Sequence, residues 1–273
     1  MRPLRGRILL LATAALAAVA AFPTIAAAAS GDEQSSNWAG WAVSDAQTIA
    51  GAPIAGSTTT LNFTSTTATW VQPKVVCSPN QPTYSAFWVG LGGLASDSSA
   101  LEQVGTQANC TAAGKAVYYA WYELVPAASV NVKLKIRPGD LITASVNVEP
   151  DGILVQVKDR TRKTNFTKLL PTPATTDFTS AEWIAEAPST CDAMLVRCRA
   201  LPLANFGAVP FTRIAAIANN HPGTVTDTTW ASTAIDLVPD ASGHFGGLGT
   251  SGTATPTAVD STGRSFQVYF GTS

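Results

Sequence analysis

The segment Val130–Lys158 constrains the fold most, because its apolar residues recur at every second position. Val130–Ile136, Leu141–Val148 and Ile153–Val157 each alternate aliphatic with mainly polar or small residues, and Arg-Pro-Gly-Asp and Glu-Pro-Asp-Gly separate them. A period of two is the spacing with which side chains alternate between the faces of a strand, and the intervening tetrapeptides are typical of turns. The segment therefore predicts a three-stranded antiparallel meander.

Six other short segments have the same β-rich character, and signals for helices are almost absent. Gly, Pro and Asn interrupt the chain about every ten residues, as in antiparallel sandwiches. We expect an all-β fold, an antiparallel β-sandwich of two curved sheets with a concanavalin- or lectin-like architecture and a concave cleft. The expected strands are Ala68–Val71, Ser85–Val89, Val117–Leu124, Ser180–Glu186, Phe211–Ile217 and Ser265–Phe270.

The N-terminus has the pattern of a secretory signal peptide. Three arginines precede an apolar run from Ile8 to about Ala21, and small residues follow up to Ala29. This order of basic, apolar and small residues predicts cleavage near Ala29, although an uncleaved anchor remains the alternative. We expect residues 1–29 to be the signal peptide and residues 30–273 to be one secreted domain, free of the membrane and monomeric.

Charge and cysteine content narrow the partners. Loss of the three N-terminal arginines lowers 17 cations to 14 against 18 acidic residues, a net charge of about −4 that argues against nucleic acid as a partner. The even number of cysteines in an exported chain predicts two disulfides. Three connectivities are possible, and we favour sequential pairing among Cys77, Cys110, Cys191 and Cys198.

The sequence lacks the residues that several classes of hydrolase need for catalysis. The two histidines, His221 and His244, lie in a turn and in a Gly-rich segment, and no Gly-x-Ser-x-Gly elbow is present. Cysteine and histidine pairs at metal-ligand spacing are also missing, so we expect neither metal nor cofactor. Two Asp-containing turns near the C-terminus match the paired motifs of pepsin-like enzymes only imperfectly. Carboxylate chemistry remains.

Ser180–Glu186 places carboxylates in an apolar, β-favouring run. On a strand, Glu182 and Glu186 share a face but lie about 13 Å apart, too far for a direct acid–base pair. A partner for Glu182 must therefore come from another strand. On the sequence alone we expect Glu102 and Glu186 to be structural.

Seven segments, in order, resemble the motifs of the glutamic peptidases (eqolisins), which cleave peptide bonds in acid with a Glu and a Gln. Gln103 and Glu182 match the strands that carry the catalytic pair. Several motifs in one order are far more specific than any one of them. The segments are Ser36–Gly40, Ala68–Pro73, Phe87–Gly93, Leu101–Gly105, Ala120–Pro126, Ala181–Glu186 and Leu203–Val209.

The resemblance implies a role for each matched residue. Glu182 would act as general base toward water and then as acid toward the leaving amine, and Gln103 would stabilise the oxyanion. Trp88 and Glu123 would line the cleft and bind polypeptide substrate. The chain departs from the family at Gly92, where an Asp is expected, and at the cleft positions Gln107 and Val125, so the family's substrate preference is not carried over.

Two other functions fit a sandwich with these residues. A lectin-like module would bind carbohydrate through Trp and polar side chains without catalysis. A glycosidase would need a second carboxylate about 5–10 Å from Glu182, for which Glu123 is the candidate. The matched Gln and Glu together favour the peptidase.

Overall fold

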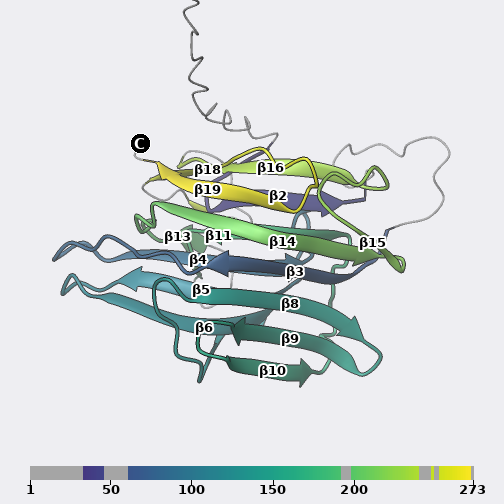
Figure 1. Ribbon diagram of the computed structural model, residues 1–273, viewed down its shortest axis with the longest axis horizontal. Coiled ribbons are helices and arrows are strands. Elements are labelled where there is room, and N and C mark those ends of the chain that lie inside the picture. The colour runs from purple at the N-terminus through teal and green to yellow at the C-terminus, as the bar shows by residue number, and fades with distance from the viewer. Residues whose placement is uncertain (1–32, 46–60, 192–197, 240–246, 249–251, 272–273) are drawn as a thin grey trace, which may run out of the picture.

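The computed structural model describes residues 33–45, 61–191, 198–239, 247–248 and 252–271 (Figure 1). The expected signal peptide and most of the Gly-rich segment lie outside these residues. In the described part of the chain the regular elements are all β, and no helix there is long and apolar enough to cross a membrane. The all-β expectation is therefore confirmed.

One mainly antiparallel sheet of 16 strands folds over on itself to make the two layers of the sandwich. The layer nearer the viewer in Figure 1 contains six strands in spatial order. They are β10 (Thr164–Leu170), β9 (Gly152–Asp159), β8 (Leu141–Glu149), β3 (Phe63–Val71), β14 (Ala208–Ala218) and β19 (Ser265–Gly271). Because strand pairing continues from this layer into the next, the expected two sheets are two halves of one hydrogen-bonded sheet.

The second layer begins where β18 pairs with both β19 and β16. It contains β18 (Thr253–Pro256), β16 (Ala231–Leu237), β2 (Trp38–Ser44), β11 (Ser180–Glu186), β4 (Thr83–Leu91), β5 (Leu101–Cys110), β6 (Ala116–Val125) and β7 (Val130–Val132). Two short strands add to this sheet. β1 (Glu33–Ser35) runs parallel to β16, and β15 (His221–Gly223) pairs antiparallel with the end of β14.

The meander prediction is right for two of its three strands. β8 and β9 form the expected hairpin, with their apolar faces buried. The first segment is different: only Val130–Val132 is a strand, and it pairs with β6 in the other layer. A backbone hydrogen bond from Leu134 N–H to Val132 O turns the chain there, and Leu134 and Ile136 enter the core without strand partners. Burial of these two side chains, not strand pairing, explains their alternation.

The core between the layers is apolar and rich in aromatic residues, as the alternation predicts. Two indoles cross it: Trp183 Nε1 on β11 donates to Thr67 O, and Trp70 Nε1 on β3 donates to the Thr106 hydroxyl on β5. Both donors are satisfied although the rings are almost fully buried. These contacts fix the two layers against each other, so the opposite face of β11, β4, β5 and β6 is left for the cavity.

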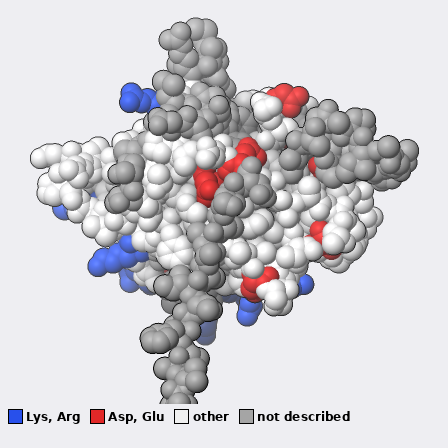
Figure 2. Space-filling view, turned by 90° about the horizontal axis from the view of Figure 1, so that it is seen from above, with Lys and Arg blue, Asp and Glu red and all other residues white. Residues whose placement is uncertain are grey.

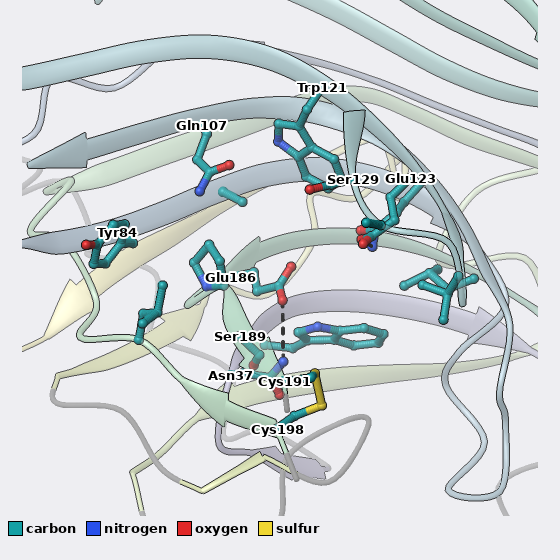
Figure 3. Close-up of a pocket in the computed structure, with 18 of the residues that line it drawn as sticks. Asn37, Tyr84, Gln107, Trp121, Glu123, Ser129, Glu186, Ser189, Cys191 and Cys198 are labelled. Carbon is teal, nitrogen blue, oxygen red and sulfur yellow. Dashed lines mark hydrogen bonds between the residues drawn. A yellow bond between two sulfur atoms is a disulfide. The ribbon is translucent and has the colours of Figure 1, made fainter. Parts of the chain in front are cut away.

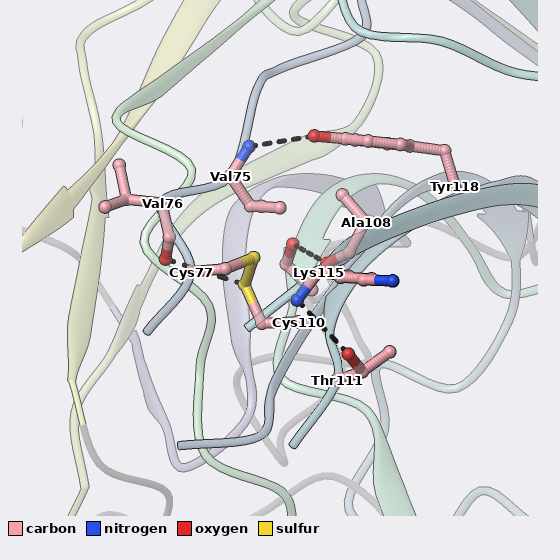
Figure 4. Close-up of a disulfide and its surroundings, with 9 residues drawn as sticks. Val75, Val76, Cys77, Ala108, Cys110, Thr111, Lys115 and Tyr118 are labelled. Carbon is pink, nitrogen blue, oxygen red and sulfur yellow. Dashed lines mark hydrogen bonds between the residues drawn. A yellow bond between two sulfur atoms is a disulfide. The ribbon is translucent and has the colours of Figure 1, made fainter. Parts of the chain in front are cut away.

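Two disulfides link the cysteines in sequential order, as favoured from the sequence. Cys77–Cys110 ties the segment before β4 to the end of β5, beside the hydrogen bond from Val75 N–H to the Tyr118 hydroxyl oxygen (Figure 4). Cys191–Cys198 joins β12 (Ser189–Cys191) to β13 (Cys198–Ala200), which with β17 (Gly247–Leu248) form a small separate sheet. The surface seen in Figure 2 is largely uncharged, in line with 13% charged residues.

Candidate active site

Strand register brings the candidate residues onto one face of the second layer. Glu182 on β11 lies opposite Gly90 on β4, Gly90 opposite Gln103 on β5, and Gln103 opposite Glu123 on β6. Residues directly opposite one another on neighbouring strands point to the same side of a sheet. The neighbouring positions of these strands, such as Val104, pack into the core between the layers. The four residues therefore share the face that points away from that core.

A cavity of about 720 Å³ lies on this face (Figure 3). Its polar wall includes Gln103, Glu123 and Glu186, and one end is lined by small and aliphatic residues of β5, β6 and the loop after β6. The disulfide Cys191–Cys198 borders another side. In the close-up, Glu123 and Glu186 reach into the same space from strands on opposite sides of it.

Glu182 does not line this cavity, contrary to the expectation that it faces Gln103 across a cleft. Its side chain is fully buried. A Cβ atom placed on Gly90 would lie 2.8 Å from Trp88 Cζ3 and 2.9 Å from Leu101 Cδ1. The indole of Trp88 and the Leu101 side chain thus fill the space above the position between Glu182 and Gln103. Burial raises the pKa of Glu182 well above its ordinary value, and the charges of Asp177 and Glu102 raise it further.

Glu186, which the sequence had suggested to be structural, is the β11 carboxyl that lines the cavity. Its Oε2 accepts a hydrogen bond of 2.7 Å from Trp88 Nε1, and its Oε1 accepts one of 3.4 Å from Asn37 Nδ2. Burial raises the Glu186 pKa to about 8, and the charge of Glu123 adds to the rise. Two neutral donors hold a carboxyl that keeps its proton through the acidic range.

Gln103 and Glu123 form a hydrogen-bonded pair across β5 and β6. Gln103 Nε2 donates to Glu123 Oε2 at 2.8 Å, and Gln103 Oε1 has no hydrogen-bond partner among the described residues. Burial raises the pKa of Glu123 to about 7, against the opposite effect of the Gln103 hydrogen bond. The amide is therefore held through one N–H, and its oxygen is buried without a hydrogen-bond partner.

Trp88 has a different place from the one expected for a substrate-binding residue. It is fully buried and is not part of the cavity wall. Its ring packs edge-on against Trp38, with ring centroids 5.0 Å apart, and Trp38 does line the cavity. Trp88 can therefore orient Glu186 through its indole N–H, while Trp38 presents the aromatic surface.

Glu186 and Asn37 line the cavity, although the sequence analysis did not propose either as a site residue. A partial signal was present, because Glu186 shares a face with Glu182 and Asn37 belongs to the Asn-Trp-Ala-Gly segment. The choice between the two glutamates depends on which one the neighbouring strands cover. Within the described ranges, no group of three or more His, Cys, Asp or Glu side chains is arranged to hold a metal ion.

Comparison with solved structures shows the fold. Scytalido-glutamic peptidase with a transition-state analogue inhibitor superposes with a TM-score of 0.64 at 21% identity, over 86% of this chain and 98% of that one. SCP-B, described as an eqolisin in complex with the tripeptide Ala-Ile-His, gives 0.60 at 20% identity, over 86% and 98% of the chains. Aspergilloglutamic peptidase from Aspergillus niger gives 0.53 at 24% identity, over 69% and 99%.

Comparison with curated protein sequences finds no match. The model of the Peptidase A4 family, by contrast, matches residues 36–241, which span all of the elements that build the cavity. The match covers most of the chain and agrees with the fold of the solved glutamic peptidases. This protein therefore belongs to the Peptidase A4 family, the glutamic peptidases or eqolisins, and is a hydrolase of the glutamic type.

Proposed function

We propose that this protein is a secreted endopeptidase that hydrolyses peptide bonds in acid with Gln103 and Glu186 as its reacting pair. The observation that carries this assignment is that both side chains line one cavity, whereas Glu182 is sealed beneath Trp88 and Leu101. The role expected of Glu182 is thus assigned to Glu186, four residues further along the same face of β11.

The raised pKa of Glu186 suits a carboxyl that enters the reaction protonated. A neutral carboxyl has one oxygen that donates and one that accepts. It can give its proton to the peptide carbonyl oxygen while the other oxygen takes a proton from the attacking water. The resulting tetrahedral species then collapses as Glu186 protonates the leaving nitrogen and takes back a proton from a hydroxyl. Each step leaves the carboxyl neutral, which its buried position favours.

Gln103 would place the water and stabilise the tetrahedral species. Its unpartnered Oε1 can accept a hydrogen bond from the water, and its second N–H can donate to the oxygen of the substrate carbonyl. Because an amide does not titrate, these contacts persist in acid. Glu123 fixes the amide plane through the bond to Nε2 and would act as a positioning residue.

Export and substrate class complete the proposal. The N-terminal pattern of residues 1–29 and the two disulfides both suit a protein that folds outside the cytoplasm. Substrates would be unfolded polypeptides, because a cavity lined by side chains of adjacent strands accommodates an extended chain and not a folded domain. The N-terminal sequence of the protein recovered from culture medium tests export, and it should begin close to Ser30.

The reacting pair is tested by digestion of a denatured protein at pH 3–5 by wild type, Glu186→Gln, Gln103→Ala and Glu182→Gln. Loss of general acid–base catalysis or of an oxyanion contact typically lowers kcat about 10²–10⁴-fold. We expect losses of this size in Glu186→Gln and Gln103→Ala. Glu182→Gln has the shape of the protonated carboxyl and should keep activity within a few-fold of wild type. Circular dichroism checks that each variant is folded.

The three variants separate the competing assignments. Full activity in folded Glu186→Gln would contradict the proposed pair, and a large loss in folded Glu182→Gln instead would restore the assignment made from the sequence. The alternative of a glycosidase gains support from Glu123 and Glu186 lying in one cavity. It would be indicated by release of sugar from a polysaccharide together with no cleavage of any denatured protein.

A further inference from the structure

The two ends of the cavity differ in chemistry. Along β5, Leu101, Gln103 and Gln107 point into it in turn, so its wall changes from aliphatic through the reacting pair to amide. At the far end the wall includes Tyr84, Gln107, Asn109 and Tyr119, whose side chains carry hydrogen-bonding groups and no charge. These four residues are here named the amide–phenol end.

The amide–phenol end begins directly beside the proposed reacting carboxyl. Strand register aligns Glu186 with Ala86, Ala86 with Gln107, and Gln107 with Tyr119. Because Ala86 contributes a single methyl group, the space between Glu186 and Gln107 stays open, as Figure 3 shows for the labelled side chains. A substrate residue next to the scissile bond would therefore meet this wall.

The hydrogen-bonding groups at this end remain available to a ligand. Gln107 and Tyr84 make no side-chain hydrogen bond within the described part of the chain, and both are only partly buried. Asn109 Nδ2 donates to the Tyr119 hydroxyl at 3.1 Å, which leaves the hydroxyl proton of Tyr119 free to donate. Burial raises the pKa of Tyr119, so this phenol stays neutral. Donors and acceptors are thus presented together without a charge among them.

We propose that Tyr84, Gln107, Asn109 and Tyr119 form a substrate subsite for an uncharged side chain that both donates and accepts hydrogen bonds, glutamine or asparagine being the best match. The inference rests on the proposed peptidase function, and it names the substrate side chain that the enzyme would prefer. A primary amide of the substrate can pair in both directions with Gln107 and receive the Tyr119 hydroxyl bond. An aliphatic side chain would leave these groups unpaired, and a lysine or glutamate would enter without a counter-charge from these four residues.

The subsite is tested with peptides that differ at one position within three residues of a fixed scissile bond. Gln, Leu, Lys and Glu are compared at each position by kcat/KM at pH 4, after the cleaved bond is located by mass spectrometry. A site that bonds a substrate amide discriminates against an aliphatic analogue, here by about 10-fold because the subsite is partly open. We expect that preference for Gln over Leu at one position, with Lys and Glu disfavoured there.

Two variants of Gln107 and a matched control test whether the amide–phenol end causes the preference for Gln over Leu in the substrate. Gln107→Leu should lower the Gln-to-Leu ratio of kcat/KM to below about 2-fold, and Gln107→Glu should raise the relative rate of the Lys peptide at least about 5-fold. Gln156→Leu makes the same chemical change at a half-buried position of β9 that does not line the cavity, and it should keep the wild-type ratio. Gln107→Glu preserves side-chain size, so it decides the matter if Gln107→Leu does not fold.

The outcomes separate this inference from the proposed function. Peptide cleavage by wild type with no position at which Gln exceeds Leu overturns the subsite and leaves the peptidase intact. An unchanged ratio in folded Gln107→Leu, or an unchanged Lys rate in Gln107→Glu, overturns it as well. Absence of cleavage of every peptide by folded wild type overturns both proposals.

Discussion

Gln103 Nε2 donates to Glu123 Oε2 at 2.8 Å, so the amide proposed to react is held by a carboxyl on the neighbouring strand. The two residues are directly opposite each other in the β5–β6 ladder, which makes their distance a consequence of register. Because both residues lie on strands and not on loops, the sheet fixes their backbone positions and the hydrogen bond holds the amide.

Removal of this carboxyl should affect turnover more than binding. In Glu123→Ala the Gln103 amide loses its anchor, so we expect kcat to fall about 10–100-fold with KM changed less than about 3-fold. Glu123→Gln retains size and a hydrogen-bonding oxygen and should recover part of the loss. Steady-state kinetics of these variants, with exposed Glu149→Gln as control, measure kcat and KM separately. A selective rise in KM would show that Glu123 binds substrate instead of positioning Gln103.

Trp88→Phe should shift the pH profile of the reaction. The indole N–H stabilises ionised Glu186 through the 2.7 Å bond, so its loss should raise the pKa of Glu186 above about 8. Activity that needs protonated Glu186 would then persist to higher pH than in wild type. Rates measured from pH 3 to 9 give the pH at which activity is lost on the alkaline side. Trp41→Phe, which loses the indole hydrogen bond to Thr257 O, is the control. It should lose activity at the same alkaline pH as wild type.

Stability should decrease from acid to neutral pH. Burial, with the charge of Asp177, raises the pKa of Glu102 from 4.5 to about 8. Between these values the folded protein keeps a proton that the unfolded chain releases, so unfolding becomes easier as pH rises. The stability contributed by protonated Glu102 is full below about pH 4.5 and is lost toward pH 8, on the order of 5 kcal/mol.

Chemical denaturation at pH 4 and pH 8 measures this loss. Glu102→Gln cannot ionise and should narrow the difference between the two pH values, whereas exposed Glu149→Gln should retain it. Equal dependence on pH in Glu102→Gln and wild type would show that another group is responsible. Glu182, whose pKa is raised in the same direction, is the first group to replace in that case.

Gly90→Ala should destabilise the fold. The added methyl would lie 2.8 Å from Trp88 Cζ3 and 2.9 Å from Leu101 Cδ1, and overpacking of this kind costs about 1–3 kcal/mol. Leu101→Ala removes one of the two contacts, so the double variant should lose less than the sum of the single losses. Urea unfolding of the four proteins in the cycle tests this coupling, and strict additivity would refute the packing above Gly90.

Period-two alternation determined much of the fold because it depends only on which side chains must be buried. β8, β9, β11 and β14 lie close to their predicted positions. The same rule failed at Leu134 and Ile136, which are buried without strand partners. Alternation reports burial on one side of an extended chain, and it contains no information on whether a neighbouring strand is present.

The sequence by itself determined that the chain is an all-β protein and that its cysteines can pair in order, and it led to the prediction that Gln103 and Glu182 react together. Only the tertiary structure shows that Glu186 lines the cavity and Glu182 does not, although the two share a face of β11 and lie about 13 Å apart, four residues along the strand. The physical reason is packing: side chains from β4 and β5 cover Glu182, while Trp88 and Asn37 hold Glu186 at the cavity. The burial of Glu182 and the exposure of Glu186 to the cavity thus depend on contacts between residues that are distant along the chain.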